Sequence, residues 1–326
     1  MDFSFPYRLR MASQGNFTGL LSQTDDEDPR CSVKLAGGIN SQLIGLSVGN
    51  IFLSITAFCG NALILAALHK VSGLHPSSKF FYRNLAISDF LIGIVVEPVR
   101  ITYWISVVKQ QWTICRYSVV ASQSLSFILF SVSLLTMTAI SIDRLLSLLL
   151  GIRYRQIVTL KRVVLIVVAF WVMSIAGASS VFFRYSQISA WYGHILIALC
   201  LVTSTFSYAK IYQTLHQHRI QIQHQVHRDH LANRAISPLN MARYKKAVST
   251  AMWIQLILAV CYIPQAIVAV FLTQKGLTSP VYTARQYGQT LSFLNSSLNP
   301  FFYFWKIGEV RQAVKNIVKQ ICCSVC

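Results

Sequence analysis

The chain has 326 residues, of which 54% are hydrophobic and 12% are charged, and its mean hydropathy is +0.51. Soluble domains carry about twice that share of charge, so the composition excludes an ordinary soluble protein and indicates an integral membrane protein. The formal net charge is +19, but most Lys and Arg lie between alternate apolar runs or after the last one, which is typical of membrane topology and argues against a nucleic-acid partner.

Residues 1–42 form a polar segment with an acidic cluster at Asp25-Asp26-Glu27-Asp28. The segment lacks a positively charged start followed by an apolar core, so we expect no cleavable signal peptide. Asn16-Phe17-Thr18 is a glycosylation sequon, which is typical of an extracellular tail. We therefore expect residues 1–42 to be an extracellular tail that is glycosylated at Asn16.

Seven apolar runs follow, each close to or longer than the roughly 20 residues that span a bilayer. They are Leu43–Leu68, Phe80–Val108, Cys115–Leu150, Val163–Phe183, Tyr192–Tyr212, Ala247–Thr273 and Val281–Trp305. They predict an all-α membrane protein, a seven-transmembrane helix bundle over residues 43–305. An odd number of spans places the termini on opposite sides, and the basic connections place the amino terminus outside.

The third run carries polar residues at steps of three and four, which share one face of a helix. They are Gln123, Ser126 and Ser133, and Met137 continues the same face. Such a stripe indicates a helix at the centre of the bundle. The run ends with Asp143 and Arg144, and charged residues at the edge of a membrane helix are candidates for function. The alternative is an interfacial charge that marks the end of the helix.

Asp89 lies within the second run, where a lone carboxylate is costly unless it is protonated, paired or bound to a cation. Polar residues at similar depth are Ser133 of the third run and Asn295, Ser296 and Asn299 of the seventh. One carboxylate with hydroxyl and amide oxygens suits a small cation such as sodium. The alternative is a structural polar network with a protonated acid, and both require these helices to meet.

Proline occurs inside the second, sixth and seventh runs, at Pro98, Pro264 and Pro300. Each removes a backbone hydrogen bond and kinks its helix. We expect the sixth and seventh helices to bend at these points.

Residues 306–326 predict an amphipathic helix on the cytoplasmic membrane surface. Its apolar face comprises Ile307, Val310, Val314, Ile317, Val318 and Ile321. Cys322 and Cys323, at its end, are candidate palmitoylation sites.

Taken in order, these motifs resemble the rhodopsin-like (class A) G-protein-coupled receptors from Leu43 to Cys323. The resemblance is carried by Gly60-Asn61, Asn84-Leu85-Ala86-Ile87-Ser88-Asp89, Asp143-Arg144, the loop Ile152–Thr159, Trp171, Tyr208, Cys261-Tyr262-Ile263-Pro264 and Asn299-Pro300-Phe301-Phe302-Tyr303. It implies a multi-pass plasma-membrane receptor without enzymatic activity. Its partners would be an extracellular ligand, a heterotrimeric G protein, arrestin and membrane lipid.

The resemblance also implies a mechanism. Ligand binding at the outer ends of the helices favours an outward swing of the sixth helix at Pro264, and Arg144 then leaves Asp143 and faces the G protein. The residues expected to take part are Asp143, Arg144, Tyr208, Tyr262, Pro264, Asn299, Pro300 and Tyr303.

The ligand class is narrowed by two substitutions. Ser126 stands where amine receptors have an aspartate, and Phe293 stands where light-sensing relatives have a lysine. The expected pocket is neutral and aromatic, with Gln123, Ser126, Phe127, Phe130, Tyr262, Gln265, Gln289 and Phe293. It suits a peptide, nucleoside or lipid-like ligand. Glu97 and Arg100, one turn apart, either pair with each other or hold a charged ligand group.

The outer loops depart from the family pattern. The connection from Arg184 to Trp191 has no cysteine, and Val119 stands where the family has a cysteine in helix 3. Such loops are similar to those of melanocortin, adenosine and lipid receptors. Cys31 and Cys115 are the cysteines expected outside, and extracellular thiols tend to oxidise. We therefore expect a Cys31–Cys115 disulfide that folds the tail over the pocket; the alternative is that both are free or that Cys115 is buried.

A seven-helix transporter or channel is the main rival. Such proteins often carry internal repeats or chains of intramembrane acids and bases. The sequence shows no repeat, and Asp89 is two helical turns from Glu97. An organic cofactor is not expected, and a sodium ion is the one modulator that the sequence indicates.

Overall fold

The computed structural model describes residues 30–32, 38–182, 186–228, 256–272, 274, 276 and 278–325. The predicted glycosylation site Asn16 lies outside these residues. So does the stretch 229–255, which contains the start of the predicted sixth span.

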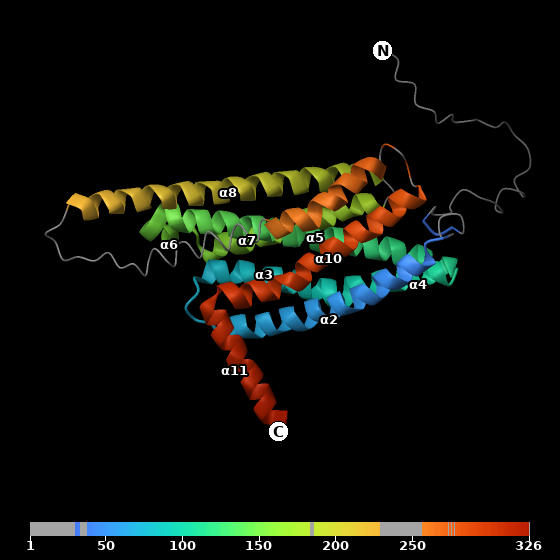
Figure 1. Ribbon diagram of the computed structural model, residues 1–326, viewed down its shortest axis with the longest axis horizontal. Coiled ribbons are helices and arrows are strands. Elements are labelled where there is room, and N and C mark those ends of the chain that lie inside the picture. Colours follow the sequence, from blue (N-terminus) through green and yellow to red (C-terminus); the bar gives the residue numbers. More distant parts are fainter. Residues whose placement is uncertain are drawn as a thin grey trace, which may run out of the picture.

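The described chain forms a bundle of long helices that run along one common axis (Figure 1). Its elements are α2 (Asn40–Lys70), α3 (Pro76–Leu91), the π-helix η1 (Ile92–Val96), α4 (Glu97–Val108), α5 (Trp112–Leu150), the short helices η2 (Gly151–Arg153) and α6 (Tyr154–Ile157), α7 (Leu160–Phe182), α8 (Ser186–Arg228), α10 (Ser279–Lys306) and α11 (Gly308–Val325). A further apolar helix covers Leu256–Leu272.

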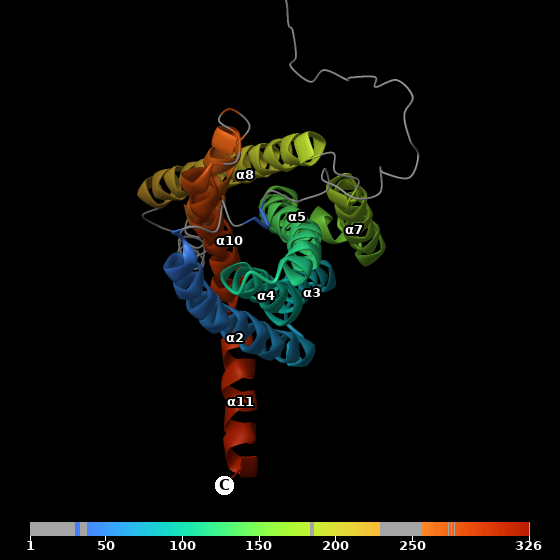
Figure 2. The same ribbon diagram turned by 90° about the vertical axis from the view of Figure 1, so that its right-hand side faces the viewer.

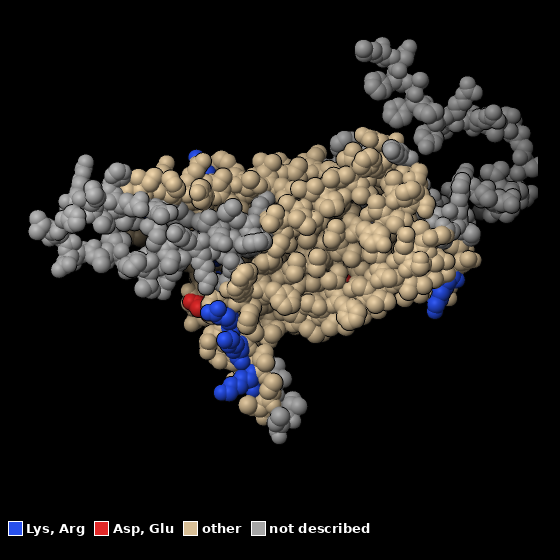
Figure 3. Space-filling model, in the orientation of Figure 1, with Lys and Arg blue, Asp and Glu red and all other residues tan. Residues whose placement is uncertain are grey.

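Five of the described helical stretches are long and apolar enough to cross a membrane, and they begin with Asn40–Lys70. The helix Leu256–Leu272 and α10 occupy the sixth and seventh predicted spans. Charged side chains are sparse along the bundle on the face seen in Figure 3. The expected all-α seven-transmembrane bundle is therefore confirmed.

The helices extend beyond the apolar runs. The largest difference is in α8, which covers Ser186–Arg228 where the sequence predicted a span over Tyr192–Tyr212. The connection before it is accordingly shorter than the expected Arg184–Trp191. At its other end α8 extends past the neighbouring helices (Figure 1), because its polar carboxyl-terminal half continues the helix out of the apolar region.

The second span is interrupted by a π-turn rather than by a simple kink. In the π-helix η1 each carbonyl accepts a hydrogen bond from the backbone N–H five residues later. The carbonyl of Gly93 would need the N–H of residue 98, but this residue is proline and has none. The hydroxyl of Ser54 on α2 donates to that carbonyl at 2.7 Å. A Cβ at Gly93 would lie 2.7 Å from the backbone nitrogen of Phe58. Glycine therefore permits the close contact that satisfies the freed carbonyl.

The seventh helix contains Pro300 and packs closely on α2. A Cβ added at Gly60 would lie 2.8 Å from Cγ of Pro300. The amide of Asn61 next to it donates to the carbonyl of Ser296 at 3.1 Å. These contacts fix α10 against α2 at the level of Pro300.

The last helix leaves the bundle at an angle beyond the end of α2 (Figures 1 and 2). Val310, Val314 and Ile317 are buried in the core cluster that includes Ile64 and Leu68 of α2. Val318, which the sequence placed on the apolar face, is 43% exposed. Basic side chains cover the outer side of α11, as Figure 3 shows; they are Arg311, Lys315 and Lys319. This amphipathic arrangement is typical of a helix lying on a membrane surface.

Candidate functional site

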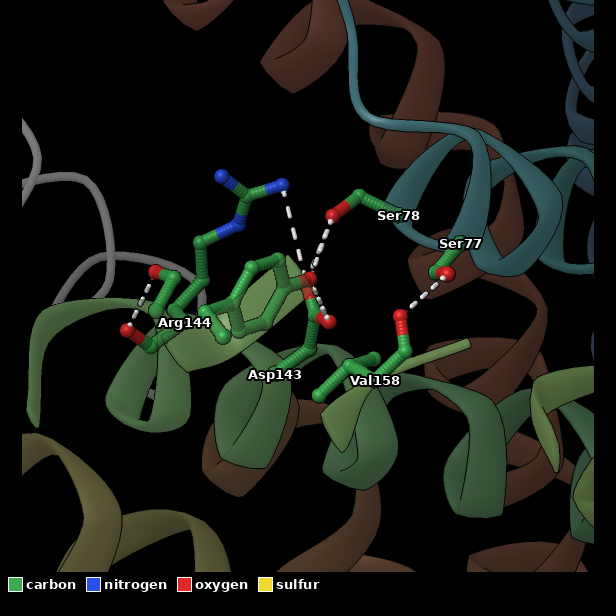
Figure 4. A network of polar contacts seen from close by, with 7 residues as sticks. Ser77, Ser78, Asp143, Arg144 and Val158 are labelled. Carbon is green, nitrogen blue, oxygen red and sulfur yellow. Dashed lines mark hydrogen bonds and ion pairs between the residues drawn. The ribbon is translucent and has the colours of Figure 1, made fainter. Parts of the chain in front are cut away.

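The end of the bundle at which α6 lies, which the sequence predicts to be the inner end, holds Asp143 in a network of hydrogen bonds (Figure 4). The hydroxyl of Ser78, at the start of α3, donates to Oδ2 at 2.7 Å. The hydroxyl of Tyr154, on α6, donates to Oδ1 at 2.5 Å. Hydrogen bonds to an ionised group are stronger than neutral ones, so these two donors fix the carboxylate and tie α3 and α6 to α5.

Arg144 is held much more loosely. Its Nη2 lies 3.8 Å from Oδ2 of Asp143, and its side chain is 40% exposed. Its guanidinium carbon lies 5.6 Å from the centre of the Tyr82 ring, and that ring packs edge-on against Tyr303 at 5.3 Å. The structure therefore places a half-exposed cation beside a firmly bound carboxylate.

Of the remaining predicted activation residues, Tyr208 and Tyr303 lie near this pair, whereas Asn299 and Tyr262 lie deeper in the bundle. The Tyr208 hydroxyl of α8 accepts a hydrogen bond from Ser141 at 2.8 Å. Ser141 lies on α5, about one helical turn before Arg144. Pro264 lies within the helix Leu256–Leu272. The sequence did not single out Ser78 or Tyr154, since a serine and a tyrosine in different segments give no joint signal before their helices are placed together.

Asp89 lies in the middle of the bundle and is fully buried. The amide of Asn299 donates to Oδ2 at 2.6 Å, and Ser133 donates to Oδ1 at 3.4 Å. The Ser296 hydroxyl is buried without a partner among the described residues. The amide of Asn295 turns to the sulfur of Met137 at 3.9 Å. Helices α3, α5 and α10 thus meet at Asp89.

This set fits a sodium ion in its donor chemistry. It offers carboxylate, hydroxyl and amide oxygens, which hard cations prefer. The hydroxyl of Ser296, which has no hydrogen-bond partner among the described residues, is available as a ligand. The described residues hold no group of three or more His, Cys, Asp or Glu that could hold a metal ion, so Asp89 is the one acid of this set.

Three of the predicted pocket aromatics form one chain of rings. Phe130 of α5 lies 6.2 Å from Tyr262 and 5.2 Å from Phe293 of α10. Phe127 turns instead to α8, where its ring lies 5.6 Å from that of Tyr192. Of the predicted pocket aromatics, Phe130, Tyr262 and Phe293 therefore form a central group, whereas Phe127 lies at its side against α8.

The predicted polar pocket residues retain unused hydrogen-bonding groups. The side-chain oxygens of Ser126, Gln265 and Gln289 are buried and lack a partner within the described chain. Gln265 packs directly on α10, because a Cβ at Gly288 would lie 2.6 Å from its Oε1. Gln123 is the exception, since its Oε1 accepts a hydrogen bond from Arg30 of the tail.

The first alternative for Glu97 and Arg100, that they pair with each other, is wrong. Both carboxyl oxygens of Glu97 are buried without a hydrogen-bond partner among the described residues, as are Nε and Nη2 of Arg100. The guanidinium of Arg100 stacks instead over Tyr103, at 5.7 Å from the ring centre. One helical turn brings the two residues to the same face, but it does not require their side chains to meet.

Cys31 and Cys115 form a disulfide with a Cα–Cα distance of 5.9 Å. Both residues are buried in an apolar cluster at the opposite end of the bundle from Asp143, with Leu43, Trp104 and Val119. The tail segment around Cys31 is therefore fastened to the start of α5. Its neighbour Arg30 reaches Gln123, two helical turns deeper along α5.

Comparison with known proteins agrees with this architecture. The family described as 7 transmembrane receptor (rhodopsin family) matches residues 60–191 and 182–303. The chain is also similar to an adenosine receptor A3 of Ovis aries, with 24% identity over 305 residues that cover 85% of this chain and 89% of the relative. The resemblance noted in the sequence is thereby confirmed: the chain is a multi-pass membrane protein that belongs to the rhodopsin family of seven-transmembrane receptors.

Proposed function

We propose that this receptor binds an extracellular ligand at the end of the bundle that carries the disulfide, and activates a heterotrimeric G protein at the end that carries Arg144. The amino terminus is then extracellular, in line with the positive-inside distribution of Lys and Arg. The observation that carries the proposal is the loose hold on Arg144 beside a tightly bound Asp143.

The two contacts differ in strength. An ion pair at 3.8 Å with a 40% exposed partner is worth about 0–1 kcal/mol. The hydrogen bonds from Ser78 and Tyr154 to the carboxylate are worth about 1.5–3 kcal/mol each. Arg144 is thus the member of the network that a protein partner can take over at low cost, and a bend of the sixth helix at Pro264 would open the way.

The ligand site we propose is the aromatic group of Phe130, Tyr262 and Phe293 with the unsatisfied oxygens of Gln265 and Gln289. Stacking faces and amide groups suit a flat, moderately polar molecule. The adenosine receptor relative makes a nucleoside the first ligand to test, ahead of peptides and lipids.

We include a sodium ion at Asp89 in the proposal. Ser133 and the spare hydroxyl of Ser296 would hold the ion with the Asp89 carboxylate. Agonists would favour the arrangement without the ion, so sodium would act as a negative modulator.

Membrane attachment and desensitisation complete the proposal. Cys322 and Cys323 are exposed at the end of α11, where palmitate would reach the bilayer. Asn16 would carry a glycan in the extracellular tail. Arrestin would bind the same inner end as the G protein.

Nucleotide exchange tests the function directly. Membranes with the receptor, a panel of nucleosides, peptides and lipids, and purified G proteins should show ligand-dependent GDP–GTP exchange. Arg144→Ala should keep surface expression and ligand binding but lose that exchange, whereas Arg155→Ala, which removes an exposed cation from α6, should retain it. Ligand-gated flux into liposomes without any exchange would favour the transporter or channel instead.

A further inference from the structure

The outer part of α4 buries an arginine that its own chain does not satisfy. Arg100 is 3% exposed, and its Nε and Nη2 have no hydrogen-bond partner in the described parts of the chain. A buried charge is costly unless it is paired and hydrogen-bonded. Two donors of one guanidinium therefore lack the acceptor that their position calls for.

Among the described residues, two further arginines act on the charge of Arg100. Arg285 of α10 and Arg30 of the tail lie close enough to repel its charge. Arg30 is kept there by the Cys31–Cys115 disulfide and by its bond to Gln123. Three guanidinium groups from three separate parts of the chain thus converge on one region.

The nearest acid on the same helix does not offset this charge. Both oxygens of Glu97 lack a hydrogen-bond partner within the residues described, so Glu97 makes no bond to Arg100. The Tyr103 ring under the guanidinium, at 5.7 Å, supports it from one face. The hydroxyl of Tyr103 is 2.5 Å from that of Tyr282, which ties this support to α10.

We propose that Arg100, with Arg30 and Arg285 beside it, binds an acidic oxyanion of the receptor's ligand, a carboxylate or a phosphate. Guanidinium groups match both of these groups with two parallel hydrogen bonds. This inference rests on the proposed function, that the protein is a ligand-binding receptor. The flat part of the ligand would stack on the aromatic group of Phe130, Tyr262 and Phe293, and the acidic group of the ligand would bind Arg100 on α4.

The test measures binding to the purified full-length receptor in nanodiscs without a G protein, so its failure is separate from a failure of coupling. Three matched pairs differ in the acid alone: AMP against adenosine, hexanoate against hexanamide, and lysophosphatidate against monoacylglycerol. We expect at least one acid to bind roughly ten- to a hundredfold more tightly than its neutral partner, the range of one or two charge-assisted hydrogen bonds. The pair that responds distinguishes a phosphate from a carboxylate.

Variants assign the effect to its residue. Arg100→Gln should remove the preference for the acid, and Arg100→Lys, which keeps the charge but loses the planar fork, should retain part of it. Arg116→Gln removes an exposed arginine from the start of α5 and should leave the preference intact. Circular dichroism and size exclusion establish that each variant is folded.

Three results would overturn the proposal. The first is that no acid of the panel binds to the wild type. The second is equal affinity for the acids and their neutral partners. The third is an unchanged preference in folded Arg100→Gln, which would assign the buried guanidinium to packing on Tyr103.

Discussion

The two ends of the bundle both bury charged residues, but they treat them in opposite ways. At the inner end, Asp143 receives hydrogen bonds from Ser78 and Tyr154. At the outer end, Arg100 and Glu97 are buried with polar atoms that find no partner among the described residues. The chain itself satisfies the Asp143 carboxylate, whereas Arg100 and Glu97 leave buried donors and acceptors for a further group to bind.

The disulfide gives the largest expected effect and concerns the outer end alone. Cys115→Ser opens a loop that spans 84 residues, and chain-entropy arguments give a loss of about 4–5 kcal/mol at most. The thermal midpoint should fall clearly, and Arg30 should lose its place near Arg100. Cys59→Ser, at an exposed free thiol, is the control. Alkylation of both Cys31 and Cys115 in the non-reduced wild type would contradict the prediction.

The next effect concerns the closure of the inner end. Tyr154→Phe and Ser78→Ala each remove a hydrogen bond to the Asp143 carboxylate, which is worth about 1.5–3 kcal/mol. When Asp143 is held less firmly, the inactive state of the receptor is less stable. Nucleotide exchange in the absence of ligand should then rise by roughly tenfold for each 1.4 kcal/mol of stability that the inactive state loses. Tyr117→Phe, at a tyrosine that is 78% exposed, should not. Unchanged basal exchange in both variants would show that the network does not restrain activation.

The contact between α2 and η1 should respond to a single methyl group. Gly93→Ala places a Cβ 2.7 Å from the backbone nitrogen of Phe58, and overpacking of this kind costs about 1–3 kcal/mol. We expect a lower thermal midpoint and a displaced α4, which carries Arg100. Gly49→Ala meets nothing within 4 Å and should be neutral or stabilising. Equal thermal midpoints for the two variants would show that α2 can move away from Gly93 without loss of stability.

Sodium should give the smallest effect, because it acts between the two ends rather than at either. Added sodium at constant ionic strength should weaken agonist affinity by about 1 kcal/mol, the low end of typical coupling energies. Asp89→Asn should remove this dependence. Wild-type affinity that ignores sodium would leave Asp89 as part of a structural polar network with Asn299 and Ser133.

The sequence predicts the bundle and the inner pair well, because both depend on local patterns. Apolar runs of membrane length locate the helices, and Asp143 and Arg144 stand where such a run ends. The partners of Asp143 could not be predicted, since Ser78 and Tyr154 come from separate segments whose meeting depends on how the helices rotate and slide against each other.

The outer end shows the same limit. Spacing placed Glu97 and Arg100 on one face, but the choice between a mutual pair and separate partners depends on Tyr103 and on neighbouring helices. The π-turn before Pro98 was missed, because it depends on the hydroxyl that Ser54 supplies from α2. The approach of Arg30 to Gln123 depends on the disulfide.

One measurement tests most directly the central claim, that the inner network restrains Arg144 and that Arg144 couples the receptor to its G protein. Basal GDP–GTP exchange is compared among the wild type, Tyr154→Phe and Tyr154→Phe/Arg144→Ala at equal surface expression. We expect exchange to rise in the single variant and to fall to the level of receptor-free membranes in the double variant. Raised exchange that persists without Arg144 would contradict it.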